Sequence, residues 1–268
     1  MKDQLGDRMK EYYEDRTRYL LPRRTYTIIR IDGKAFHTYT HGLTRPFDMG
    51  LIEDMDATAC YLCKNIQGAK MGFVQSDEIS IVMTDFDKIN TSAWFDGNLQ
   101  KIASIAASLA TAKFNELRFM RYAEVVGTED HEYVDFSQCK LATFDARVFT
   151  IPSKIEVANM LIWRQQDTVR NSISSVAQYW YPNHKDLEFK STADMQEMIH
   201  EKGDNWNNYD AKLKRGRFIF KKEVQLETPF IGIEFAQNSY VRNTWVSEEC
   251  PIFTQEPDFL LSRIPDNV

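Results

Sequence analysis

The sequence predicts an α+β fold with a ferredoxin-like core, in which segments follow the order strand, helix, strand, strand, helix, strand. Two observations predict it: short apolar runs that end at turn residues, and longer segments whose apolar residues recur at helical spacing. We expect residues 1–150 to form this core with an N-terminal arm. Residues 151–268 are expected to add a helical and short-strand extension that packs on the core as one structural unit.

The core segments follow one another without long gaps. They are a strand at 25–31, a helix after Asp48, a hairpin with arms at 71–74 and 79–82, a helix at about 92–116 and a strand at 142–150. In the second helix, Ile102, Ile105 and Leu109 are spaced to face inward. Beyond the core the sequence predicts a long helix at about 154–181, a short helix at about 192–201, and strand-like segments at 217–220 and 230–234.

Composition narrows the class of protein. The chain has 268 residues, 43% of them hydrophobic, which suits an ordered protein with a sizeable core. No apolar run approaches the length of a membrane span and the N-terminus is no signal peptide, so we expect a soluble, cytoplasmic protein. A net charge of −6 argues against a general polyanion binder, although basic clusters at 16–24 and 212–222 suit either a local RNA contact or a solvated surface. Cys60 and Cys63 form a lone pair that no second pair completes into a zinc site.

Acidic residues mark the ends of two predicted strands. Asp32 follows the first strand, and Asp77 and Glu78 lie at the tip of the hairpin. Because the first and third strands of a ferredoxin-like sheet are antiparallel neighbours, Asp32 and Asp77 are expected side by side. Like charges at close range raise a carboxyl pKa unless a cation compensates, and Mg²⁺ prefers oxygen ligands. Taken singly, each acid also suits an ordinary turn.

The acids together predict a site for two Mg²⁺ ions that serves phosphoryl or nucleotidyl transfer. Asp32, Asp77 and the carbonyl of Gly33 are the expected metal ligands, since glycine allows close approach to the backbone. Glu78 is expected either to bind the metal or to orient the site.

Six short motifs together resemble one known family. They are RIDGKAFH at 30–37, RPFD at 45–48, QSDE at 75–78, FDAR at 144–147, WRQQD at 163–167 and NWNN at 205–208. On these residues, in this order, the chain is similar to the tRNA-His guanylyltransferases, which add nucleotides to RNA in the 3′-to-5′ direction. Residues 169–172 read VRNS where eukaryotic members have His-Ile-Asn-Asn. The chain therefore resembles the bacterial and archaeal guanylyltransferase-like branch, whose members are similar to template-dependent repair polymerases for tRNA 5′ ends.

This resemblance implies a palm-type catalytic core that uses Mg²⁺, with ATP and GTP or another NTP as substrates. It implies tRNA as the partner and a homotetramer built as a dimer of dimers. The RNA 5′-monophosphate would first attack the α-phosphate of ATP, and the 3′-hydroxyl of an incoming NTP would then attack the adenylylated end and expel AMP. Both steps are in-line displacements that depend on positioning and charge neutralisation.

The residues expected to contact nucleotide or RNA fall into two groups. Those for the nucleotide are Gly33, Lys34, Ala35, Phe36, His37, Arg45, Asp48 and Ser76. Residues 34–37 would use mainly backbone N–H groups, with the His37 contact implied by the resemblance, and Asp48 suits either a base contact or a helix N-cap. The resemblance assigns contacts with the RNA 5′ end or a second triphosphate to Lys101, Arg147, Arg164 and Asn171. Each of these cations also suits an ordinary surface charge.

Two other functions stay open on the sequence. A nucleotidyl cyclase or cyclic-dinucleotide synthase uses the same core and the same acids, although it has no need for the family-like segments at 163–220. A non-catalytic RNA-binding module is the third possibility, and the intact Asp32, Asp77 and Glu78 argue against it.

Overall fold

The computed structural model describes residues 4–126, 137, 139–227 and 239–267. The strands are β1 (Tyr26–Gly33), β2 (Ala69–Gln75), β3 (Glu78–Met83), β4 (Phe144–Ile151), β5 (Arg217–Glu227) and β6 (Ser239–Glu249). The helices are α1 (Gln4–Met9), α2 (Phe36–Tyr39), α3 (Met49–Asn65), α4 (Leu99–Val126), α5 (Lys154–Trp180), α6 (Thr192–Glu201), α7 (Ala211–Arg215) and α8 (Pro257–Leu261). The predicted segment at 230–234 lies outside the described residues.

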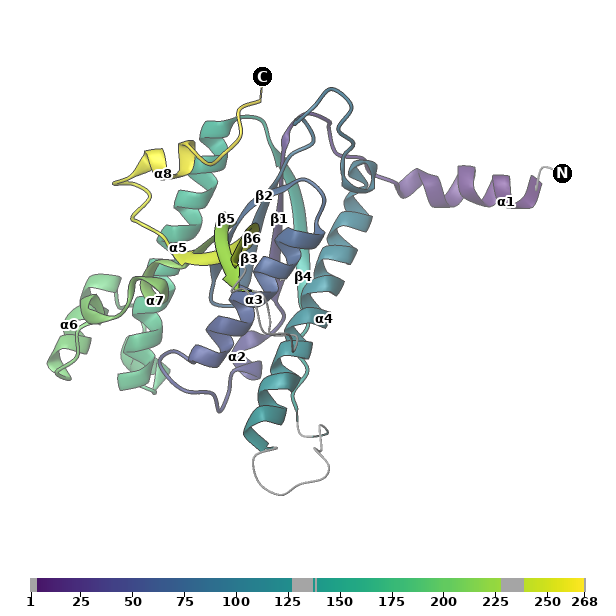
Figure 1. The fold of residues 1–268 in the computed structure, drawn as a ribbon. Coiled ribbons are helices and arrows are strands. Elements are labelled where there is room, and N and C mark those ends of the chain that lie inside the picture. The colour runs from purple at the N-terminus through teal and green to yellow at the C-terminus, as the bar shows by residue number, and fades with distance from the viewer. Residues whose placement is uncertain (1–3, 127–136, 138, 228–238, 268) are drawn as a thin grey trace, which may run out of the picture.

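The six strands form one sheet in the order β4-β1-β3-β2-β5-β6, and each neighbouring pair is antiparallel (Figure 1). The first four strands with α3 and α4 reproduce the predicted ferredoxin-like order, so the predicted fold class is confirmed. β5 and β6 extend the same sheet beyond β2. The division of the chain at residue 150 stays a prediction.

Helices cover both faces of the sheet. Residues that alternate along β1 point to opposite faces, so Ile29 and Ile31 pack with α3 and α4, while Tyr26 and Ile28 pack with α5. Continuing this alternation to the end of β1 places Asp32 on the α5 face. Asp32 therefore lies on the face of the sheet opposite to the apolar core that α3 and α4 cover.

The helix predicted at about 92–116 begins and ends later, as α4, at Leu99 and Val126. A separate turn over Trp94–Gly97 precedes it, in which Phe95 and Asp96 have positive φ angles that an α-helix does not allow. The expectation that Ile105 faces inward is wrong, because this side chain is 38% exposed. The buried face of α4 runs instead through residues four positions apart, namely Ile102, Ala106, Ala110 and Phe114.

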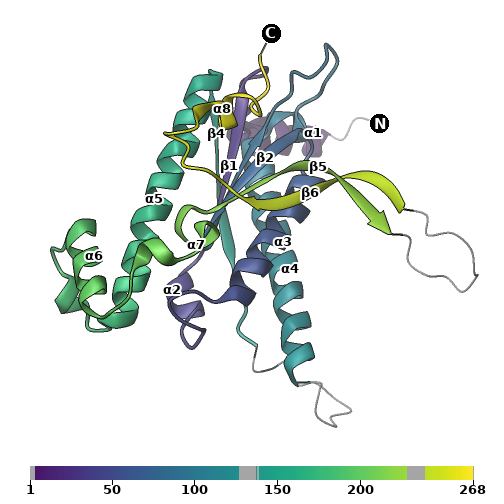
Figure 2. The ribbon, with the colours of Figure 1, turned by 60° about the vertical axis from the view of Figure 1, so that its left-hand side comes forward.

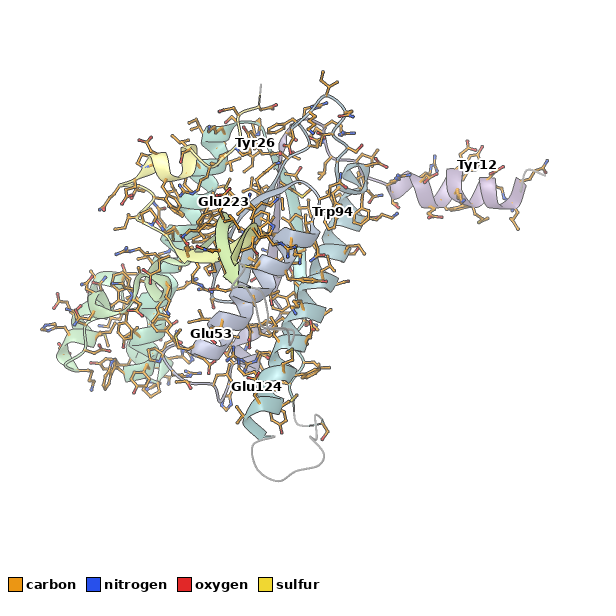
Figure 3. The ribbon with its side chains drawn as sticks, in the orientation of Figure 1. Tyr12, Tyr26, Glu53, Trp94, Glu124 and Glu223 are labelled. Atoms are coloured by element: carbon orange, nitrogen blue, oxygen red, sulfur yellow. The ribbon has the colours of Figure 1, made fainter. Side chains whose placement is uncertain are left out.

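Two segments extend from the body of the molecule. The β5–β6 hairpin projects on one side (Figure 2), and the N-terminal arm with α1 projects on another. Figure 3 shows Tyr12 on this arm, away from the sheet, and its side chain is exposed. No helix in the described part of the chain is long and apolar enough to cross a membrane.

Candidate active site

The predicted meeting of the first and third strands is confirmed at the acidic end of the sheet. Asp32, near the end of β1, lies directly opposite Glu78, the first residue of β3. Asp77 precedes Glu78 in the turn that joins β2 to β3. On the other side of Asp32, β4 places the exposed Asp145 directly opposite. The sequence did not indicate Asp145 as a site residue. The antiparallel register of β1 and β4 places it beside Asp32.

Asp77 lies in an excess of negative charge. The pKa of its carboxyl group is raised to about 6, chiefly by burial and also by the charges of Asp32 and Glu78, against hydrogen bonds that lower it. In the described part of the chain Asp77 makes no ion pair. A cation that binds here would therefore relieve an unfavourable carboxylate environment.

Glu78 has the opposite environment, although it is the next residue. Arg164 of α5 donates to Glu78 from Nε (2.7 Å to Oε1) and from Nη2 (2.8 Å to Oε2), and both residues are buried. Gln75 donates to the same carboxylate at 3.1 Å. Arg164 is buried because α5 packs this part of its surface against the sheet rather than against solvent. Glu78 thus has the geometry of an orienting group, and the RNA contact of Arg164 stays a prediction.

The donor set at Asp32 and Asp77 fits Mg²⁺. No three His, Cys, Asp or Glu side chains gather in a metal-binding group among the described residues. Mg²⁺ does not require one, since it is commonly bound by one or two carboxylates together with water and substrate phosphates. Among the described residues Asp77 makes no ion pair, and Asp32 has Arg147 at 3.7 Å. These two hard carboxylate ligands suit a metal that arrives with a nucleotide.

The segment after Asp32 is shaped by Phe36. This side chain is buried against Phe114 and Phe144, and a Cβ atom at Gly33 would lie 2.2 Å from its ring. Glycine is thus required at 33 by packing, whatever its carbonyl binds. The N–H of Lys34 donates to the Thr143 carbonyl at 2.8 Å, so it is already paired. Backbone contacts with a nucleotide would fall to residues 35–37.

A pocket of about 260 Å³ adjoins the acidic end of the sheet. Five of the predicted site residues line it, from α2, the following loop, the tip of the β2–β3 hairpin and α5: His37, Arg45, Asp48, Ser76 and Asn171. These residues span 135 positions of the sequence (171 − 37 + 1), so the fold rather than local order brings them together.

Asp48 caps α3. Its Oδ1 accepts a hydrogen bond from the Leu51 N–H at 2.7 Å, and its Oδ2 accepts one from the Thr44 N–H at 3.2 Å. The capping interpretation is therefore confirmed. Both carboxylate oxygens of Asp48 thus already accept hydrogen bonds from the backbone. A contact of Asp48 with a nucleotide base stays a prediction.

The remaining predicted cations lie in different places. Arg147 on β4 is exposed, and its Nη2 is 3.7 Å from Oδ2 of Asp32. Lys101 lies in the first turn of α4, which adjoins the N-terminal arm at the end of the sheet opposite to α2 (Figure 1). The structure brings Arg147 to the acids and does not bring Lys101 there.

Comparison with known proteins decides the family. The profile of the tRNAHis guanylyltransferase family matches residues 6–152, which is more than half of the chain. The chain belongs to this family. The tRNAHis guanylyltransferases are nucleotidyltransferases, so the predicted family and enzyme class are confirmed.

Relatives within the tRNAHis guanylyltransferase family match nearly the whole chain. A bacterial tRNA(His) guanylyltransferase-like protein in complex with ATP is 42% identical, with a TM-score of 0.79 over 98% of this chain and 99% of that one. A bacterial tRNA(His) guanylyltransferase-like protein in complex with GTP is 41% identical, with a TM-score of 0.77 and the same coverage. The probable tRNA(His) guanylyltransferase of Dictyostelium discoideum is 27% identical over 91% of this chain and 94% of its own length.

Proposed function

We propose that this chain adds nucleotides to the 5′ end of tRNA in the 3′-to-5′ direction, with the opposite strand of the acceptor stem as template. One observation carries the proposal. Ser76 lines the pocket and is followed in the same turn by Asp77, so the pocket and the acidic end of the sheet are contiguous. A nucleotide whose base and sugar lie in the pocket would have its phosphates at Asp32 and Asp77.

We propose different roles in phosphoryl transfer for the acids and for the pocket residues. Asp32, Asp77 and the Gly33 carbonyl are the proposed ligands of Mg²⁺, which when bound supplies neutralisation of phosphate charge. Glu78, fixed by Arg164, keeps the start of β3 in position beside Asp32. His37, Arg45 and Ser76 are proposed to hold the triphosphate by hydrogen bonds, some of them charge-assisted.

Two displacements make up the proposed reaction. The RNA 5′-phosphate attacks the α-phosphate of ATP, which releases pyrophosphate and leaves an adenylylated end. The 3′-hydroxyl of the incoming NTP then attacks the RNA 5′-phosphorus, and AMP leaves. Arg147, exposed next to Asp32, is proposed to orient the RNA phosphate in both steps. Asn171, Lys101 and Arg164 are the further proposed contacts with RNA or a second triphosphate.

The substrates and partners follow from the family. Guanylyltransferase-like relatives have been solved with ATP and with GTP, and we propose both as substrates of this chain. Base pairing across the acceptor stem would select the added nucleotide. A tRNA partner, a homotetramer built as a dimer of dimers, and a cytoplasmic location complete the proposal.

The test uses a tRNA that lacks its first nucleotide and carries a 5′-monophosphate, together with ATP, labelled NTPs and Mg²⁺. We expect growth at the 5′ end by the nucleotide that pairs with the base opposite the gap. Changing only that opposite base provides the matched control, since the added nucleotide should change with it.

Three other results would revise the proposal. Guanylate addition confined to tRNA-His, whatever the opposing base, would assign the chain to the dedicated branch of the family. Conversion of the NTPs to cyclic products without growth would establish the cyclase instead. RNA binding without either reaction would leave a non-catalytic binding module.

A further inference from the structure

Arg217 forms part of the pocket wall, although the sequence showed it only as one member of a basic cluster. It is the first residue of β5 and pairs with Val74 of β2, two positions before Ser76. Its side chain lines the pocket and the residue is only 4% exposed. Gly216 brings the chain close to β2 there, because a Cβ atom on it would lie 2.7 Å from the Val74 carbonyl oxygen. The position of Arg217 is therefore fixed by the sheet.

The guanidinium group of Arg217 is only partly satisfied. Its Nε donates to Oδ1 of Asp56 at 2.7 Å, and Oδ2 of the same aspartate accepts from the Ser247 hydroxyl at 2.8 Å. Its Nη2 is buried and has no hydrogen-bond partner in the described part of the chain. Buried donors without acceptors are rare in native proteins because they are unfavourable. A bound molecule that presents an acceptor would satisfy this one.

We propose that Arg217 recognises the purine base of the nucleotide in this pocket, through donation from Nη2 to the base edge, and favours guanine over adenine. The inference rests on the nucleotide site proposed above and adds a specificity-determining residue to it. It concerns the first binding of a nucleotide, before any pairing with the RNA template.

The surroundings of Arg217 suit a base better than a phosphate. Asp56 neutralises the guanidinium charge, so what the group offers the pocket is mainly directional hydrogen bonding. Apolar side chains also line the pocket, including Leu43, Leu51 and Leu213, and these suit the faces of a planar ring.

The chemistry of the donor selects guanine. A guanidinium group has donors and no acceptor. Guanine presents two acceptors, O6 and N7, on one edge, whereas adenine replaces O6 with an amino group that is itself a donor. N7 is common to both purines, so discrimination requires Nη2 to face position 6. There guanine O6 would accept its hydrogen bond, whereas adenine would place its amino donor next to the guanidinium donor.

The test measures the dissociation constants of GTP, ATP and 2-aminopurine riboside triphosphate by calorimetry, with Mg²⁺ and without RNA. The third ligand resembles GTP but lacks O6. We expect the unmodified chain to bind GTP about tenfold more tightly than either other ligand, which corresponds to one hydrogen bond to a buried donor. Arg217→Met and Arg217→Lys should both lose this preference, with ATP affinity kept within about twofold. Lys221→Met is the matched control, because it removes an exposed cation from the same strand outside the pocket.

The ratio of affinities makes the test robust to partial misfolding, since unfolded protein weakens all three ligands alike. An unchanged GTP-to-ATP ratio in folded Arg217→Met would overturn the inference. If neither variant folds, the unmodified chain still decides, because equal affinity for GTP and the ligand without O6 would also overturn it. A shifted ratio in a chain that adds no nucleotide to tRNA would keep this inference and remove the proposed function. Templated addition to tRNA together with an unchanged GTP-to-ATP affinity ratio in Arg217→Met would keep the proposed function and overturn this inference.

Discussion

Asp77 and Glu78 are adjacent in the chain, but their carboxyl groups have opposite environments. Glu78 is buried and accepts hydrogen bonds from Arg164 and Gln75. Asp77 makes no ion pair within the described residues, and burial with two neighbouring acids raises its pKa to about 6. The backbone explains how both exist together, because Glu78 begins β3 on the face covered by α5 whereas Asp77 lies in the preceding turn.

This difference indicates a structural role for Glu78 and a chemical role for Asp77. A buried carboxylate with a two-point arginine pair has one geometry and little capacity to bind anything else. A carboxylate in excess negative charge stores an unfavourable interaction that a cation relieves. We infer that Glu78 fixes the register of the acidic end of the sheet and that Asp77 binds the metal.

The largest expected effect follows from removing the charge of Asp77. Asp77→Asn should lower the rate of 5′ nucleotide addition about a thousandfold or more, because metal ions contribute several kcal/mol to such transition states and each 1.4 kcal/mol is tenfold. The measurement is single-turnover addition to the shortened tRNA, with folding verified by circular dichroism. Asp32→Asn should behave in the same way. Loss of less than tenfold in both variants would contradict a metal role for these acids.

Substitution of Arg164 tests whether the Glu78–Arg164 pair stabilises the fold. Arg164→Met removes the two-point arginine pair of the buried Glu78 and leaves it only the Gln75 hydrogen bond and Arg30 Nε at 3.7 Å, so we expect the free energy of unfolding to fall by about 3 kcal/mol. Arg170→Met is the matched control, since Arg170 pairs with the same Asp167 but its side chain is 57% exposed, and its loss should cost less than about 1 kcal/mol. Urea unfolding of both variants at neutral pH measures the two values. Equal small losses would show that the Glu78–Arg164 pair does not stabilise the fold.

The same contrast shows how far the sequence leads. Strand and helix periodicity predicts the core order and the approach of Asp32 to the hairpin tip, because both depend on local patterns and one topological rule. The burial of Arg164 was not predicted, since it depends on which face of α5 meets the sheet. Arg217 was missed for a similar reason: its role depends on the pairing of β5 with β2, which nothing local in 217–220 indicates. Side chains that meet through tertiary packing are thus the ones that one sequence reveals least.

The smallest expected effect is a dependence of stability on pH. The folded-state pKa of Asp77 is raised from 3.8 to about 6, so the folded chain binds more protons than the unfolded chain between these values. The contribution of Asp77 to stability is therefore fully present below about pH 4 and is lost as the pH rises through about 6. Two pKa units set an upper limit of about 3 kcal/mol, and partial exposure to solvent reduces our expectation to about 1–2 kcal/mol.

Thermal unfolding of the original chain and Asp77→Asn from pH 4 to pH 7.5, without metal or nucleotide, measures this contribution. Above pH 6 the variant should be the more stable protein. The difference should shrink to a small fraction near pH 4, where Asp77 is protonated in the folded chain and about half protonated in the unfolded chain. A stability difference that stays constant over this range would mean that the charge of Asp77 is compensated by the protein itself. Addition of Mg²⁺ and GTP at pH 7.5 should then stabilise the original chain more than the variant, because only the aspartate has a negative charge for the metal to neutralise. The residue that destabilises the empty site would thereby be the one that stabilises the loaded site.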